Sequence, residues 1–156
     1  MKRSLHAMAG LIAIAMIVLF IVATLYSEFS GNRDLIFVVK RGIAFPGIEI
    51  LVCVMVLAGG SGRSLAKSRS VALAAKKARR MRFVALNGIA ILIPCAILLA
   101  YWATYGILTA RFYVVQSIEI LAGLTNLTML VLNMRDGLLL KRTRTGKATA
   151  GTRRET

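Results

Sequence analysis

The sequence predicts an all-α fold, namely an integral membrane four-helix bundle with both termini in the cytoplasm. Two observations carry this prediction: four long apolar runs, and an uneven distribution of positive charge between them. Of the 156 residues, 58% are hydrophobic, compared with roughly 45–50% in soluble domains. The chain also carries 21 Lys and Arg residues against 6 Asp and Glu. A chain that is both apolar and basic keeps its charges outside its spans.

Four apolar runs are predicted to cross the membrane within a single domain over residues 1–140. A bilayer core about 30 Å thick needs about 20 apolar residues at a rise of 1.5 Å each. The first and third runs contain no formal charge, and the fourth contains only Glu119. The predicted spans cover residues 5–26, 42–60, 83–104 and 112–134.

The second run is the least regular, because it holds both Pro46 and Glu49. The apolar stretch that follows Glu49 is long enough to carry the prediction. An alternative start near Leu35 places Lys40 and Arg41 inside the span, with their charged ends extending to the interface.

The first span follows a charged N-terminus, so a cleaved signal peptide is an alternative that would leave three spans. An uncleaved span is favoured, because the apolar run exceeds the usual length of about 7–15 residues and no small-x-small cleavage site precedes Glu28. Cleavage would leave the orientation of the other spans unchanged.

The orientation follows from the count of positive residues, which are retained on the cytoplasmic side. The N-terminus, the basic loop over residues 61–82 and the tail from Arg135 together hold 17 Lys and Arg residues, and the opposite side holds 4. Both termini are therefore predicted to be cytoplasmic, in the cell inner membrane. Tyr101, Trp102 and Tyr105 lie at the opposite ends of the spans, where Tyr and Trp favour the interface.

The basic loop and tail are predicted to contact anionic lipid headgroups. Residues 64–82 contain no acid and predict an interfacial helix, since each Lys or Arg near an anionic leaflet contributes about 1 kcal/mol. Residues 141–156 lack apolar periodicity and predict a disordered basic tail. Nucleic acid is the alternative partner, but no aromatic residues interleave the basic ones to stack on bases. No nucleic-acid partner is therefore expected.

The fourth span carries an intramembrane polar stripe formed by Gln116, Glu119, Asn126 and Asn133. Their separations of three and seven residues place them on one helix face. Because unpaired polar groups are costly in hydrocarbon, this face must turn away from lipid. A structural seam is favoured over a path for solutes or protons, since amides and small residues commonly join membrane helices.

Glu49 and Glu119 form a candidate proton or ion site. With the spans as predicted, both carboxyl groups lie about 10 Å below the outer boundary, where they could share a proton. A start of the second span near Leu35 moves Glu49 to about 21 Å and separates the two acids. Alternatively, Lys40 or Arg41 neutralises one acid in a structural ion pair.

The third span has two features that concern packing. Asn87 and Asn126 lie at similar depths, about 25 and 21 Å, which predicts an amide contact between them. Pro94 lacks a backbone donor and predicts a kink near Ala90. Both features favour a compact bundle.

The sequence predicts no catalytic residue, metal site or cofactor. His6 is the single histidine, so one chain cannot supply two axial ligands to a haem or build a three-histidine metal site. Residues 59–63 lack the ending of a phosphate-binding loop and the last glycine of a nucleophile elbow. Cys53 and Cys95 lie in different apolar runs, which indicates buried free thiols.

Residues 113–137, which end in the sequence NMRDG, resemble small four-span bacterial inner-membrane proteins of unassigned function. The resemblance implies no activity. The favoured function is a non-enzymatic accessory or interaction subunit, whose partner is another membrane protein or a second copy of the chain. The alternative is a small proton- or cation-coupled transporter or channel that uses Glu49 and Glu119.

Overall fold

The computed structural model describes the backbone of residues 2–66 and 71–152, and the side chains of residues 4–60 and 78–136. These segments are helical apart from two short connections, and they contain no strand, which confirms the all-α prediction for this part of the chain. Two π-helical turns, η1 and η2, interrupt the longer helices. The elements are α1 (Lys2–Phe29), α2 (Arg33–Gly42), η1 (Ile43–Gly47), α3 (Ile48–Ala66), α4 (Val71–Asn87), η2 (Gly88–Leu92), α5 (Ile93–Thr104) and α6 (Ala110–Thr152).

Within the described residues, four helical stretches are long enough and apolar enough to cross a membrane, which agrees with the predicted number of apolar spans. The second stretch begins at Arg33 and not at residue 42, so the alternative start near Leu35 is the better one. A cap explains this start, because the Asn32 side chain accepts hydrogen bonds from the backbone N–H groups of Asp34 and Leu35. The stretches are Ser4–Phe29, Arg33–Gly60, Ala78–Thr104 and Ala110–Asp136.

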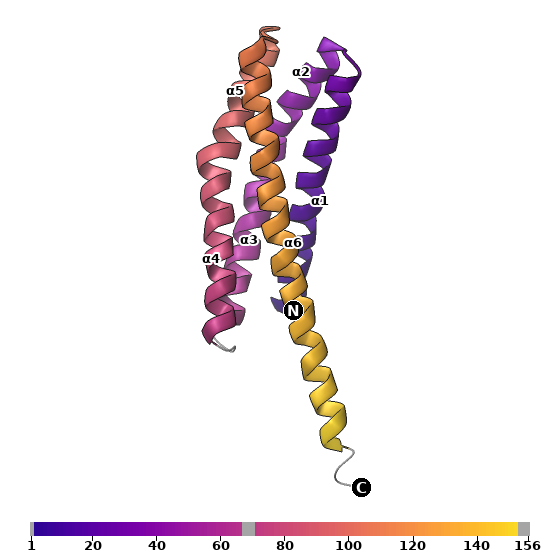
Figure 1. The fold of residues 1–156 in the computed structure, drawn as a ribbon, viewed down its shortest axis with the longest axis vertical. Coiled ribbons are helices and arrows are strands. Elements are labelled where there is room, and N and C mark those ends of the chain that lie inside the picture. Colours follow the sequence, from indigo (N-terminus) through magenta and orange to yellow (C-terminus); the bar gives the residue numbers. More distant parts are fainter. Residues whose placement is uncertain (1, 67–70, 153–156) are drawn as a thin grey trace.

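The four stretches run up and down in chain order and form a bundle in which each packs against its neighbours (Figure 1). α1 packs along α3, α2 packs against α5, and α6 packs on α1, α4 and α5. The connections over residues 30–32 and 105–109 lie together at one end, which we call the short-loop end. The opposite end holds the N-terminus and Arg79, Arg80 and Arg82 near the start of the third stretch. We call it the basic end.

Two π-helical turns interrupt the second and third stretches, and each is associated with a proline. Pro46 lies within η1, and Phe45 before it has non-helical backbone angles (φ −145°, ψ 115°). Pro94 follows η2, which includes Ala90, the position of the predicted kink. Proline lacks an N–H group and its ring clashes with the carbonyl four residues earlier, so a widened turn accommodates it.

Apolar side chains that range in size from Ala to Phe fill the interior, and many large ones also face outward. Val56 is 66% exposed and Ile89 is 68% exposed. Such an extensive apolar exterior is typical of a surface that faces lipid. The buried clusters are Ala13, Ile17, Val84 and Leu130 toward the basic end, and Ile36, Leu99, Ala103 and Phe112 toward the short-loop end.

The structure differs from the prediction in both basic segments. α4 begins at Val71 and continues into the third stretch, so residues 71–82 are the first turns of a long helix and not a separate interfacial helix. α6 continues to Thr152, where a disordered tail is expected. Residues 71–82 are rich in Lys, Arg and Ala, which are strong helix formers. The tail also contains Thr and Gly, which are weak helix formers, so its helix continues from α6 and is not explained by local propensity. Residues 67–70 and 153–156 lie outside the described part of the chain, and contact of these segments with lipid stays a prediction.

Candidate functional site in the bundle interior

The polar stripe of α6 lies inside the bundle. Gln116, Glu119, Asn126 and Asn133 are all buried, with 4–9% of each residue exposed. Because α6 packs on α1, α4 and α5, the stripe faces other helices and not the exterior. The stripe has two parts. The charged part, around Glu119, lies near the short-loop end, and the amide part, around Asn126, lies farther along the helix.

In the charged part, Glu119 forms a buried ion pair with Lys40 of α2. Lys40 Nζ lies 2.7 Å from Glu119 Oε2, and the Lys40 side chain is 1% exposed. The ammonium group also donates a hydrogen bond to the Thr24 hydroxyl of α1 at 3.5 Å. Charges this deeply buried must be paired, because an isolated ion costs several kcal/mol. The pair therefore joins three helices, α1, α2 and α6, at one point.

Lys40 and Arg41 take different positions, although both were candidates for neutralising an acid. The Arg41 side chain is exposed, and its guanidinium lies over the Phe37 ring at 5.9 Å from the centroid. Adjacent residues point about 100° apart on a helix, so one side chain faces the bundle and the next faces outward. Lys40 consequently does not extend to the interface, contrary to the expectation for a span that starts near Leu35.

Glu49 does not meet Glu119, so the prediction that these two carboxyl groups could share a proton is wrong. The second stretch begins at Arg33, so Glu49 lies about 24 Å along it, whereas Glu119 lies about 14 Å along the fourth stretch from Ala110. Glu49 is also exposed on α3, whereas Glu119 is buried and bonded to Lys40. The structure therefore holds the two acids apart in depth and in environment.

The amide part of the stripe joins the third and fourth stretches. Asn87 Nδ2 donates hydrogen bonds to Asn126 Oδ1 at 2.8 Å and to the Ala122 carbonyl at 3.0 Å. Asn126 Nδ2 donates to the Val84 carbonyl at 3.3 Å. The structure thus brings Asn87 and Asn126 together, as expected from their depths. Interhelical amide bonds of this kind stabilise pairs of membrane helices.

Some buried polar atoms of the interior have no hydrogen-bond partner among the described residues. They are Gln116 Oε1, Glu28 Oε1 and both polar atoms of the Asn133 amide. Asn133 lies two turns beyond Asn126 on the same helix face, yet no described residue offers it a donor or an acceptor. A buried polar group without a partner costs about 1–3 kcal/mol. Asn133 is therefore a source of instability in the isolated chain.

Two hydroxyl residues of α1 belong to the charged part but were not predicted. Thr24 is 3% exposed and Ser27 is fully buried, and Ser27 Oγ donates to the Thr24 carbonyl at 2.8 Å. Their separation of three residues places them on one face, which is a signal in the sequence. Hydroxyl groups often bond to their own helix, however, so this signal alone does not identify a site.

At the basic end, two contacts hold the helices together. Arg80 Nη1 lies 2.7 Å from Asp136 Oδ2, which joins α4 to α6. His6 Nδ1 lies 3.0 Å from the Ala58 carbonyl, which joins α1 to α3. The single histidine therefore has a structural contact in this chain.

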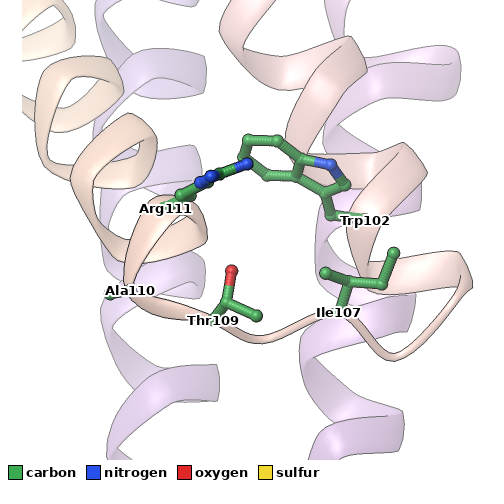
Figure 2. Close-up of a pocket in the computed structure, with 5 residues that line it drawn as sticks. All are labelled: Trp102, Ile107, Thr109, Ala110 and Arg111. Carbon is green, nitrogen blue, oxygen red and sulfur yellow. The ribbon is translucent and has the colours of Figure 1, made fainter.

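An open pocket lies at the short-loop end, apart from the stripe. Figure 2 shows it at the connection between α5 and α6, with Trp102 and Arg111 pointing toward one another across it. A tryptophan and an arginine at the end of a span are typical interface anchors. The residues that line the pocket are Trp102, Ile107, Thr109, Ala110 and Arg111.

Within the described part of the chain, no group of three or more His, Cys, Asp or Glu side chains could hold a metal ion. Cys95 is half-buried, but Cys53 is exposed on α3, so its prediction as a buried thiol is wrong. The apolar run predicts that Cys53 lies in a span, but it does not show which helix face is packed.

Comparison of the chain with known protein families, curated proteins and solved structures finds no match.

Proposed function

We propose that the chain is a multi-pass protein of the cell inner membrane, with both termini in the cytoplasm, and that it acts as a non-enzymatic accessory or interaction subunit. Four apolar stretches support the membrane location. The distribution of Lys and Arg supports the orientation, since 17 of these residues lie in the N-terminus, the basic loop and the tail, whereas the opposite end has only Arg33 and Arg111, with Lys40 and Arg41 inside the second stretch.

The Lys40–Glu119 ion pair is the observation that favours this function over transport. A carboxyl group that carries protons or cations must exchange them with water during each cycle. Glu119 instead has a lysine at 2.7 Å, and that lysine is 1% exposed. Farther along the seam, Asn87 and Asn126 bond to each other and to backbone carbonyls. These groups use their hydrogen-bonding capacity on neighbouring helices, which is the behaviour of a packing seam.

A stability cycle tests whether the ion pair is structural. Lys40→Met or Glu119→Leu alone should lower the free energy of unfolding by about 3–5 kcal/mol, because each leaves one buried charge without its partner. The double variant Lys40→Met/Glu119→Leu should recover most of that loss, since apolar side chains can replace a buried pair. Thermal unfolding in mild detergent measures all four proteins.

Proton flux in proteoliposomes tests the alternative of a proton-coupled transporter. Under a potassium diffusion potential, vesicles that contain the wild-type protein should acidify no faster than protein-free vesicles. Wild-type flux that is lost in a folded Glu119→Gln variant would contradict the accessory function. Sodium and potassium uptake by the same vesicles extends the test to cation coupling.

A further inference from the structure

Glu49 occupies an unusual place on the outer surface of the bundle. It lies about 24 Å from the Arg33 end and about 16 Å from the Gly60 end of the second stretch, close to its middle. Its side chain is exposed, and the described residues of the chain offer it no hydrogen bond or ion pair. The other exposed charges of the described stretches lie nearer to an end, the deepest being Arg41 at about 12 Å.

A carboxyl group at this depth is costly if it faces lipid. Acids at the centre of a span almost always face protein or a watery cavity. Glu119 meets this requirement within the chain through Lys40. Glu49 has no such partner among the described residues, which points to a partner from outside the monomer.

The surface around Glu49 is suited to a second helix. Glu49, Cys53, Val56 and Gly60 are separated by four, three and four residues, so they form one exposed face of α3, which we call the Glu49 face. Cys53 and Gly60 have small side chains, which allow the backbones of two helices to approach closely. The face therefore combines a polar group with room for close packing.

We propose that the Glu49 face of α3 binds the same face of a second copy of this chain, in a symmetric dimer whose two Glu49 carboxyl groups bond to each other. This inference rests on the proposed function and names the partner. A second copy in the same orientation presents its Glu49 at the same depth, and a two-fold axis that passes beside Glu49 brings the two Glu49 side chains together. Carboxyl groups that hold at least one proton between them are both donor and acceptor, so the contact is self-complementary.

The cations of a second copy do not offer a better contact. Lys40 is buried and bonded to Glu119, and Arg41 lies about 12 Å nearer the short-loop end than Glu49. Side chains on a helix also lean toward its N-terminus, which carries Arg41 away from Glu49. In a dimer of this chain, the Glu49 carboxyl group of one copy therefore contacts the Glu49 carboxyl group of the other and not a cation.

Cysteine cross-linking in membranes tests the dimer, because Cys53 lies one turn from Glu49 on the same face. In a Cys95→Ala background, oxidation or a short bismaleimide should join two Cys53 thiols into a covalent dimer. The control carries Cys53→Ala and Leu11→Cys on α1. Leu11 is 54% exposed and lies at a matched depth, about 10 Å from the basic end. This control should give at least tenfold less dimer.

Two Glu49 variants test the polar contact. Glu49→Leu should reduce the Cys53 cross-link at least tenfold, whereas Glu49→Gln should retain it, because an amide is also both donor and acceptor. A yield for Glu49→Leu equal to that of the wild type would overturn the role of Glu49. The comparison between Cys53 and Leu11→Cys requires no change at Glu49, so it remains decisive if the leucine variant does not fold.

The outcomes also separate this inference from the proposed function. Equal cross-linking at Cys53 and at the Leu11→Cys control would overturn the dimer. Cross-linking of Cys53 to a different membrane protein would also overturn it and would indicate a partner with a cation or donor at that depth. Neither result affects the accessory function, which fails instead if wild-type vesicles carry a flux that Glu119→Gln abolishes.

Discussion

At the scale of single residues, Asn126 and Asn133 form a natural comparison. Both are buried on one face of α6, and 4% of each is exposed. Asn126 bonds to the Asn87 amide and to the Val84 carbonyl, whereas neither polar atom of Asn133 has a partner among the described residues. The same side chain therefore stabilises the bundle at one position and destabilises it at the other.

Leucine substitutions at these two positions should have opposite effects. Asn126→Leu should lower the free energy of unfolding by about 0.6–2 kcal/mol, because it removes the interhelical hydrogen bonds from Asn126 to Asn87 and to the Val84 carbonyl. Asn133→Leu should be neutral or stabilising, since it removes two unpaired polar atoms from the interior. Detergent-induced unfolding followed by circular dichroism measures both. An equal loss in the two variants would show that Asn133 has a partner outside the described residues.

At the scale of elements, the buried side chains of an uninterrupted helix are easier to predict than those of the second stretch, which contains an irregular turn. The stripe of α6 lies on an uninterrupted helix, so the spacing of Gln116, Glu119, Asn126 and Asn133 was enough to place all four inside. In the second stretch, Lys40 precedes an irregular turn, and its partner Glu119 is 79 residues away in sequence. No local pattern selects Lys40 over Arg41.

The irregular turn η1 depends on a close approach between it and α1. A Cβ atom added at Gly47 would lie 2.8 Å from Phe20 Cζ and 2.9 Å from the Gly42 carbonyl oxygen. Gly47→Ala should therefore destabilise the bundle by about 1–3 kcal/mol, because the backbone at Gly42 cannot move aside freely.

Gly59→Ala is the matched control for Gly47→Ala. Gly59 lies within α3, and a Cβ atom added there would meet no atom within 4 Å. Alanine is a better helix former than glycine by roughly 0.5–1 kcal/mol, so this variant should be neutral or slightly more stable. Thermal unfolding of both variants checks the comparison, and a stable Gly47→Ala protein would show that the contact with Phe20 and Gly42 is loose.

At the scale of the whole molecule, the lengths of the apolar runs predict most of the helical architecture. Apolar runs of sufficient length gave the number of helical stretches, and three of the four lie close to their predicted bounds. Their packing depends on contacts that a single stretch does not reveal. The outward position of Glu49 is an example, because the apolar residues around it are as common on a lipid-facing surface as in an interior.

Labelling of single cysteines with a membrane-impermeant maleimide tests the central claim, that the four stretches cross the membrane with both ends in the cytoplasm. In a Cys53→Ala/Cys95→Ala background, Ile107→Cys at the short-loop end should be labelled in intact cells. Thr156→Cys should be labelled only after the membrane is permeabilised. Labelling of Thr156→Cys in intact cells, or protection of Ile107→Cys until permeabilisation, would contradict the account.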